Sequence, residues 1–291
     1  MKMNFENVLL LYKKSAYSIY FLERKAVLIR KKTPDIKNEI KRFKKAHDEH
    51  HRTLKIVESM LRRYGIRCSK RSRGQRIDFS KYDLVITVGG DGTFLEAARS
   101  LKDQVIIGVN SAPSFSVGKL CAADAKNFPD IMNGLLHDRL RFTFWPRLHL
   151  NLQGHACPVE CTNDILVCHS NPAAMSRYYL EMRGIKEEQR SSGLWIAAPA
   201  GTSGAIKSAG GRVLKPDEKK IQYMPRELYG GFKQKYRLQG GILNAGSTIT
   251  ITSLMREGAI FVDGTHFNLK FPFNAVGKVS LSPHPLRTVK I

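Results

Sequence analysis

A single carboxylate, Asp91, stands within a run of glycines that follows an apolar, strand-like stretch. The run reads GGDGT over residues 89–93, between YDLVITV and the helix-like FLEAARSL. Glycines let a backbone approach phosphate closely, and the amides at a helix start carry partial positive charge. A carboxylate beside phosphates repels them unless a cation bridges the two groups or the carboxylate takes a proton from a reacting hydroxyl. The loop is therefore consistent with phosphoryl transfer to an alcohol.

A simpler interpretation of the same loop is a turn in which Asp91 only caps the following helix. The stretch is neither a Walker P-loop nor a G-x-G-x-x-G fingerprint, because the Lys-Ser/Thr pair and the required spacing are absent. Taken alone, the five residues leave both interpretations open.

Two further stretches offer polar groups to a ligand. Residues 191–211, SSGLWIAAPAGTSGAIKSAGG, combine a strand, a P-x-G-T-S turn and a small-residue segment that ends in two glycines. Asn163 and Asp164 stand at the head of the strand-like TNDILV. An amide beside a carboxylate can hold ribose hydroxyls or an adenine edge. An Asx turn that opens a hairpin would explain the same pair.

The elements that must position these residues differ between the two halves of the chain. Residues 7–12, 26–30, 82–88 and 104–110 are strand candidates, and apolar spacing from Thr33-Pro34 predicts one or two helices that end near Gly65. Near-continuous apolar runs are typical of central parallel strands. The first half is therefore predicted to be an open, parallel, Rossmann-like α/β domain.

Beyond about residue 141 the pattern changes to short alternating strands. They are RLHLNL, DILVCH, RYYLEMR, GLWIAAP, STITITS and AIFVDG, with turn residues between them. This pattern predicts a second, predominantly β, sandwich-like domain. We expect the α/β nucleotide-binding domain at residues 1–135 and the β-rich dinucleotide-binding domain at 136–271.

The composition limits the classes of ligand that the protein could bind, but it does not identify one function. The chain has 291 residues and 42% apolar content, enough to bury a core in each of two domains. Lys and Arg number 48 against 25 Asp and Glu, a net charge of +23 that attracts nucleic acid, anionic membranes or phosphate-rich substrates. The five cysteines contain no C-x-x-C pair, so we expect mostly free, buried thiols and no protein-bound metal.

The histidine-rich stretch at residues 47–51 and the lack of a long apolar run do not point to a particular chemistry. The histidine-rich HDEHH of residues 47–51 lies in a basic amphipathic pattern and is expected to be a solvated helix face. No secretory leader and no long apolar run is visible, so we expect a cytoplasmic protein that does not cross a membrane.

The motifs in combination resemble the NAD kinase family. GGDGT is followed roughly 70 residues later by an N-D pair, then by P-x-G-T-S and S-x-G-G in that order. The resemblance covers residues 82–211 and extends weakly to GAIFVDG at 258–264, and GVNSAP, GKLCAAD and NDILVCHSNPAAMSR look similar to the plant-type NADH kinase branch. It implies that ATP, with Mg²⁺ or another divalent cation, phosphorylates the adenosine 2′-hydroxyl of NAD or NADH. It also implies a homo-oligomer, dimer or tetramer, and a C-terminal tail, residues 272–291, that returns to the first domain.

The resemblance also assigns roles to individual residues. Asp91 matches the base that activates the 2′-hydroxyl. The remaining matches are the phosphate-contacting loop at Gly89, Gly90, Gly92 and Thr93, the dinucleotide-binding pair at Asn163 and Asp164, the turn around the acceptor at Pro199, Gly201, Thr202 and Ser203, and the first two residues of an N-T/S-D motif at Asn110 and Ser111.

Three positions depart from the family pattern. Ala112 replaces the aspartate of N-T/S-D, Ser192 replaces an acidic residue before Gly-Leu, and Ala205 replaces a common tyrosine. These departures affect substrate contacts more than the class of reaction.

Two other functions compete with the kinase interpretation. A lipid kinase of the diacylglycerol or sphingosine type also uses GGDGT, but it is expected to lack the P-x-G-T-S and S-x-G-G stretch. A nucleic-acid-binding protein would explain the positive charge through phosphate contacts. It would leave the glycine loops unexplained, so we expect no specific nucleic-acid partner.

Overall fold

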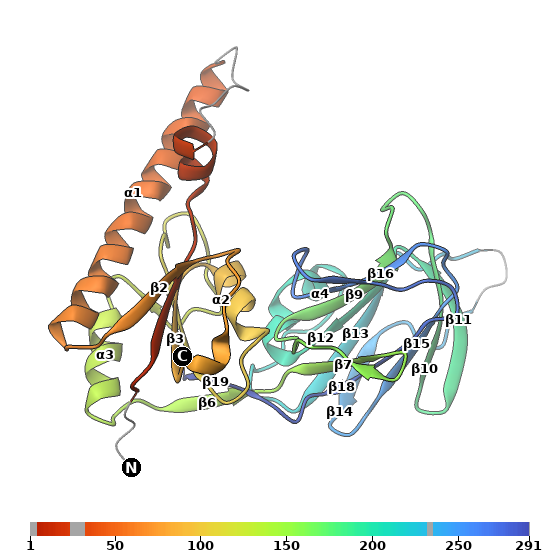
Figure 1. Ribbon diagram of the computed structural model, residues 1–291. Coiled ribbons are helices and arrows are strands. Elements are labelled where there is room, and N and C mark those ends of the chain that lie inside the picture. Colours follow the sequence, from red (N-terminus) through yellow and green to blue (C-terminus); the bar gives the residue numbers. More distant parts are fainter. Residues whose placement is uncertain (1–4, 24–32, 232–234, 291) are drawn as a thin grey trace. The chain divides into compact units, whose positions relative to one another are not determined.

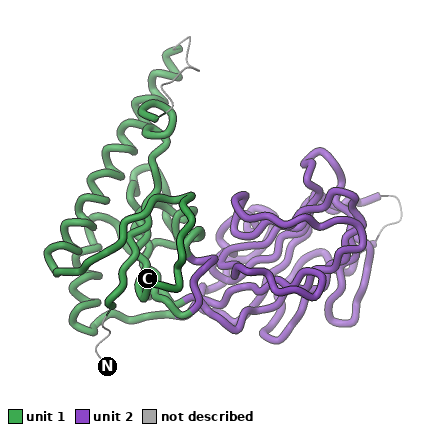
Figure 2. Tube along the Cα trace, viewed as in Figure 1, with its two compact units in different colours: residues 1–97, 103–143, 287–291 green, residues 98–102, 144–286 purple. Residues whose placement is uncertain are grey.

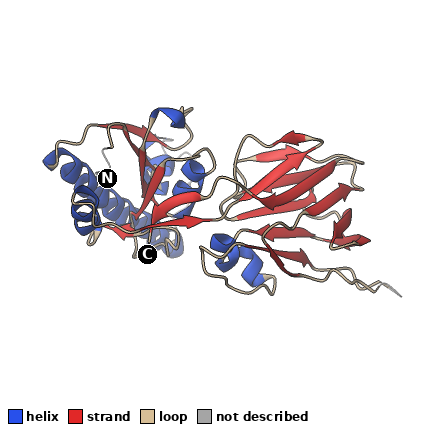
Figure 3. Cartoon of the chain, turned by 90° about the horizontal axis from the view of Figure 1, so that it is seen from below, coloured by secondary structure: helices blue, strands red, loops and turns tan. Residues whose placement is uncertain are grey.

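The computed structural model describes residues 5–23, 33–231 and 235–290 and divides the chain into two compact units. Unit 1 comprises Met1–Ala97, Asp103–Thr143 and Arg287–Ile291, and unit 2 comprises Ala98–Lys102 and Phe144–Leu286 (Figure 2). The strand expected at residues 26–30 lies outside the described residues. In Figure 3 helices are concentrated in unit 1, whereas unit 2 consists mainly of strands.

Unit 1 is built on one sheet with the order β2-β1-β3-β4-β19-β6, in which β5 also pairs with β4. The pairings of β1 with β2 and β3, and of β4 with β3, β5 and β19, are parallel. The strands are β1 (Val8–Tyr12), β2 (Cys68–Ser72), β3 (Leu84–Gly89), β4 (Val105–Asn110), β5 (Ala123–Asp124), β6 (Phe142–Trp145) and β19 (Leu286–Val289).

Helices cover both faces of this sheet, because its central strands are apolar on both sides. Figure 1 shows α1 (Pro34–Arg63) and α3 (Phe128–Leu136) against one face and α2 (Asp91–Ala98) against the other. Leu54 and Val57 of α1 and Met132 of α3 pack in one core cluster with alternate residues of β1, β3 and β4. The short helical turns of this unit are η1 (Ser18–Glu23) and η2 (Phe79–Lys81).

The helix expected after Thr33 is one continuous element. The Thr33 side chain accepts a hydrogen bond from the Ile36 amide and Pro34 begins α1, as the sequence predicts. The expectation that residues 47–51 form a solvated face is wrong for His50, which is 1% exposed. His50 lies on the same face as Thr53 and Leu54, and that face packs against the rest of unit 1.

Unit 2 is a sandwich of two antiparallel sheets, with the orders β11-β10-β15-β18-β7-β8 and β14-β13-β12-β9-β16-β17. Apolar residues of both sheets form one buried cluster, which includes Tyr178, Ile196 and Ile251. The strands are β7 (Leu148–Leu152), β8 (His155–Ala156), β9 (Asp164–His169), β10 (Ser176–Met182), β11 (Ile185–Ser191), β12 (Gly193–Ala197), β13 (Lys220–Arg226), β14 (Gly241–Asn244), β15 (Ile249–Ser253), β16 (Gly258–Val262), β17 (Asn268–Lys270) and β18 (Val276–Leu281). The short helices are η3 (Pro199–Ser203) and α4 (Ala205–Ser208).

The predicted fold class is confirmed, although several strands were not expected. The six alternating stretches named from the sequence form β7, β9, β10, β12, β15 and β16. β11 was not expected because IKEEQRS is almost entirely polar, and this strand forms through its pairing with β10. β13 contains Pro225, which usually argues against an inner strand.

One buried cation holds several segments of unit 2 together. Arg147 is fully buried, and its guanidinium donates to the carbonyl oxygens of Ala98 (2.8 Å), Leu101 (2.9 Å) and His284 (2.7 Å). These carbonyls belong to segments far apart in the chain. The guanidinium therefore joins these segments through hydrogen bonds to their backbone.

We expect Arg147→Met to destabilise unit 2 by about 3 kcal/mol or more, because charge-assisted hydrogen bonds are lost and buried carbonyls lose their donors. Both tryptophans, Trp145 and Trp195, belong to unit 2, so their fluorescence during urea unfolding reports on this unit. Arg177→Met is the control: it removes an exposed ion pair to Glu188 and should cost less than about 1 kcal/mol. Equal urea midpoints for the two variants would contradict this role of Arg147.

Candidate active site

The glycine loop of unit 1 lies where two neighbouring parallel strands, β3 and β4, end. β3 ends at Gly89, α2 begins at Asp91, and Gly89 is paired with Asn110, the last residue of β4. The Ser111 amide then donates to the Gly89 carbonyl oxygen at 2.7 Å. The structure thus brings the residues 89–93 and 110–111 together at the carboxyl edge of the sheet, where doubly wound folds bind nucleotides.

Two of the loop glycines have close neighbours, and Gly89 has the least room. A Cβ on Gly89 would collide with the Thr93 side chain, and a Cβ on Gly92 would lie 3.3 Å from Nη1 of Arg73. Gly90 has more room, because only the Ser116 hydroxyl would lie within 4 Å of its Cβ, at 3.7 Å. The loop is therefore packed tightly at both ends and open at its centre.

The carboxylate of Asp91 is half-buried and held by backbone. Its Oδ1 accepts from the Leu120 amide at 2.8 Å, and its Oδ2 accepts from the Lys119 amide at 3.1 Å. A carboxylate oxygen can accept more than one hydrogen bond, so both oxygens keep capacity for a substrate hydroxyl. In the sequence, residues 118–120 are part of the GKLCAAD stretch that resembles the plant-type branch, and nothing in that stretch indicates a contact with Asp91.

Asn110 and Ser111 are both buried. The Asn110 side chain donates to the Ser116 carbonyl oxygen at 2.9 Å and accepts from the Ser116 hydroxyl at 2.9 Å. These bonds close the loop 111–116 over the end of β4. Ala112, where the family carries an aspartate, is 2% exposed and contributes no charge.

The other predicted binding residues lie together in unit 2. The Ala198 amide donates to the Asn163 carbonyl oxygen at 3.0 Å, which joins the end of β12 to the start of β9. A Cβ on Gly201 would collide with the Asn163 backbone, so only glycine allows this approach of the turn. Thr202 is fully buried; its hydroxyl donates to Pro199 and accepts from the Leu214 amide. Ser203 remains partly exposed.

A carboxylate that the sequence analysis had not singled out, Asp263, organises this pair. It follows β16 with φ of 50° and accepts from the amides of Asn163 (2.6 Å) and Thr162 (3.0 Å). The local signal was the Asp-Gly pair in FVDG, which is typical of a turn with positive φ. Only the pairing of β16 with β9 reveals its contact with Asn163.

Asp164 and Asp263 are two buried carboxyl groups close to one another. Burial, and then the charge of Asp263, raises the pKa of Asp164 to about 7. Burial also raises the pKa of Asp263, although the amides of Thr162 and Asn163 oppose the shift. Asp164 is therefore poised to change charge near neutral pH.

A cavity of about 370 Å³ opens beside Asp164 within unit 2. Its lining includes Ser192, Trp195 and Phe261, and the Arg226 guanidinium lies 5.8 Å from the centre of the Trp195 ring. Flat aromatic surface next to polar groups suits a heterocyclic ring.

Ala205, the remaining departure from the family pattern, begins α4 and is exposed.

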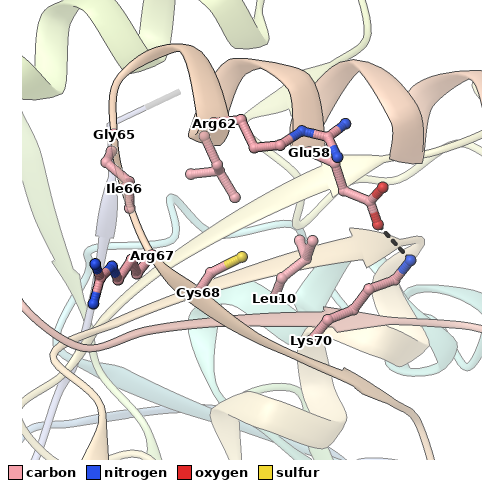
Figure 4. A pocket seen from close by; sticks show the side chains of 9 residues that line it. Leu10, Glu58, Arg62, Gly65, Ile66, Arg67, Cys68 and Lys70 are labelled. Atoms are coloured by element: carbon pink, nitrogen blue, oxygen red, sulfur yellow. Dashed lines mark ion pairs between the residues drawn. The ribbon is translucent and has the colours of Figure 1, made fainter.

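A larger groove of about 610 Å³ in unit 1 contains none of the predicted site residues. Figure 4 shows it between the end of α1 and β2, with Leu10 and Cys68 beneath and an ion pair between Glu58 and Lys70. Within the part of the chain that the structure describes, no three His, Cys, Asp or Glu side chains gather to hold a metal. Over the same residues, no helix is long and apolar enough to span a membrane.

Comparison with known proteins places this geometry in a family. The model of the ATP-NAD kinase N-terminal domain matches residues 13–140. A probable NADH kinase from Oryza sativa subsp. japonica is 35% identical over an alignment of 243 residues that covers 75% of this chain and 74% of the relative. The NADH kinase of Arabidopsis thaliana is 31% identical over 202 residues, covering 61% and 64% of the two chains. The expected likeness to the plant-type branch is confirmed.

Solved structures share the fold. A crystal structure of an NAD kinase from Archaeoglobus fulgidus in complex with ATP superposes with a TM-score of 0.68 at 19% identity, covering 98% of this chain and 93% of that one. A crystal structure of yeast NADH kinase complexed with NADH gives a TM-score of 0.73 at 15% identity, covering 98% and 83%. The extent of the match to the rice relative, together with the glycine loop that bears Asp91 at the carboxyl edge of a parallel sheet, shows that this chain belongs to the NAD kinase family.

Proposed function

We propose that the protein transfers the γ-phosphoryl group of ATP to the adenosine 2′-hydroxyl of NAD or NADH. The observation that carries this proposal is the position of Asp91 at the start of α2, beside glycines that leave the backbone open to phosphate. The names of the plant relatives support a dinucleotide acceptor. Neither lipid-kinase nor nucleic-acid-binding activity is supported by these relatives.

Asp91 is proposed to take the proton of the 2′-hydroxyl as the phosphoryl group is transferred. The amides of Lys119 and Leu120 keep the carboxylate in one orientation, so that little rearrangement precedes the reaction. Gly89, Gly90, Gly92 and Thr93 are proposed to contact the phosphates. A divalent cation such as Mg²⁺ would be held mainly by the nucleotide phosphates, with Asp91 as a nearby protein oxygen, and would offset phosphate charge.

The pair Asn163 and Asp164 is proposed to bind the dinucleotide, with the turn at Pro199, Gly201, Thr202 and Ser203 closing around it. Gly201 packs on the Asn163 backbone, so a change in the turn would move the binding pair. The cavity beside Asp164 has room for one flat ring of the dinucleotide. Trp195 would provide an aromatic surface for that ring.

We make two broader proposals, of which only the first comes from the family resemblance. One is that the protein works as a homo-oligomer, a dimer or tetramer, which light scattering of the purified protein would test. The other is a cytoplasmic location, which imaging of a fluorescent fusion would test; a monomer or an organellar pattern would contradict them.

The decisive assay offers ATP and Mg²⁺ with NAD or NADH separately and quantifies the 2′-phosphorylated product. We expect NADH to be accepted at least comparably to NAD. Ala205 provides no aromatic face where many family members carry tyrosine, so a cation–π preference of ~0.5–2 kcal/mol for the oxidised ring is absent. Product from neither dinucleotide would overturn the proposed function, whereas product from NAD alone would overturn only the acceptor preference.

Asp91→Asn is expected to lower kcat by ~10²–10⁴ while NAD still binds, because the amide keeps the shape of the side chain but removes its basicity. Calorimetric titration with NAD checks binding, and initial rates check turnover. Asp78→Asn is the control, because Asp78 lies on an exposed turn next to Ser80 in the same unit. A kcat in Asp91→Asn within a few-fold of the unmodified protein would rule out the base assignment.

Asp164 should make dinucleotide binding depend on pH. If the ionised carboxylate binds ribose hydroxyls and its pKa is about 7, the affinity for NAD should rise about tenfold between about pH 6 and about pH 8. Asp164→Asn should bind more weakly and lose most of this dependence. A pH profile of the dissociation constant that is the same in both proteins would contradict the role of Asp164.

The pKa of Asp164 can be checked without any ligand. Because folding raises this pKa from its ordinary value of 3.8, the unfolded chain releases the proton at a lower pH than the folded protein does. The free energy of unfolding should therefore fall, relative to Asp164→Asn, as the pH rises from about 4 to about 7 and then level off. Urea unfolding curves of both proteins measure this difference, and a constant difference over that window would refute the raised pKa.

A further inference from the structure

Two cationic side chains follow directly after neighbouring strands at the same sheet edge as Asp91. Lys13 comes after β1 and Arg73 after β2. The Arg73 amide donates to the Tyr12 carbonyl oxygen at 2.9 Å, and the Lys13 amide donates to the Val88 carbonyl oxygen at 3.1 Å. Both cations are therefore anchored by backbone beside the end of β3, where the glycine loop begins.

The guanidinium of Arg73 lies over the glycine loop in a fixed orientation. Its Nε donates to Oε2 of Glu96 in α2 at 2.6 Å, and the second oxygen of Glu96 accepts from the Gly74 amide at 2.8 Å. Its Nη1 is the atom that a Cβ on Gly92 would approach. Glycine at position 92 thus leaves room for a cation directly above the loop.

Lys13 is a largely buried cation that forms no ion pair with a carboxylate among the residues described in unit 1. Its surroundings are Arg73, which repels it, and two groups that are neutral near pH 7. These are Cys121, whose thiol pKa burial and the charge of Asp91 raise to about 12, and His50, whose pKa burial lowers to about 3. Burial, and then Arg73, lowers the pKa of Lys13 itself.

An unpaired buried ammonium costs free energy, which an anionic ligand can offset. Cys121 follows Leu120, whose amide holds the Asp91 carboxylate, and the charges of Lys13 and Asp91 both act on the Cys121 thiol. The Lys13 amide is bonded to Val88, next to the glycine loop, so Lys13 and the proposed base belong to the same edge of the sheet. A phosphate placed between Lys13 and Arg73, whose charge Glu96 partly offsets, would meet two cations that counter the repulsion from Asp91.

We propose that Lys13 and Arg73 form a phosphate-chain subsite beside Gly90 and Gly92. This proposal rests on the proposed function. It adds two side chains that would offset the negative charge of a polyphosphate bound next to Asp91. The phosphate chain has two possible sources, the triphosphate of ATP and the pyrophosphate of the dinucleotide. Both have the chemistry that a lysine and an arginine recognise.

The test measures binding and needs no turnover. Calorimetric titrations of the full chain with inorganic tripolyphosphate, ATP and NAD, each at about 150 mM salt, compare the unmodified protein with Lys13→Met. The affinity for tripolyphosphate and ATP is expected to fall on the order of tenfold or more, with that for NAD unchanged. A fall for NAD and tripolyphosphate but not for ATP would assign the subsite to the pyrophosphate of the dinucleotide.

Lys14→Met is the matched control, because Lys14 is exposed and paired with Glu23 at 3.0 Å. It removes the same charge from the next residue, so an equal loss of affinity in both variants would show only the general positive field and overturn the proposal. Lys13→Arg should keep most of the affinity, which separates loss of the cation from a disturbed fold. Unchanged tripolyphosphate, ATP and NAD affinities in folded Lys13→Met would also overturn the subsite, whether or not the kinase assay succeeds.

Discussion

The electrostatic conflict between a carboxylate and phosphate in one loop constrains the rest of unit 1. Asp91 must stay fixed and accessible, yet its charge opposes the ligand that the glycines admit. The protein meets the first requirement with backbone, because the amides of Lys119 and Leu120 each hold one oxygen. These donors orient the group without adding a formal charge, and positive charge comes separately from Arg73, which Glu96 orients over Gly92.

In unit 2 a carboxylate is again bound by two consecutive backbone amides, but there it orients a strand end and not a proposed base. Asp263 accepts from Thr162 and Asn163, and thereby fixes the backbone from which Asn163 and Asp164 extend. The cost is that a second carboxyl group, Asp164, lies beside it in a buried place. The pKa of Asp164 is raised as a consequence, first because burial disfavours the charged carboxylate and then because the charge of Asp263 opposes it.

The parts of the fold that local chemistry determines could be predicted from the sequence. Thr33-Pro34 specified the start of α1, and the apolar runs at residues 82–88 and 104–110 specified central parallel strands. What could not be predicted depends on partners distant in the chain. In the sequence His50 cannot be told from His47 and His51, which stay partly exposed, until α1 packs, and Asp263 resembles a turn residue until β16 pairs with β9.

The net charge of +23 also says little about ligand binding by itself. The surroundings of individual charged residues matter more than their number. Most of the basic residues of α1 are exposed, where water and salt screen them, and two of them, Arg42 and Lys44, are paired with acidic neighbours on the same helix. Lys13 differs because burial removes that screening and Arg73 adds repulsion. A single desolvated cation near Asp91 can therefore affect an anionic ligand more than many surface charges, since an interaction in a poorly solvated site is weakened less by water.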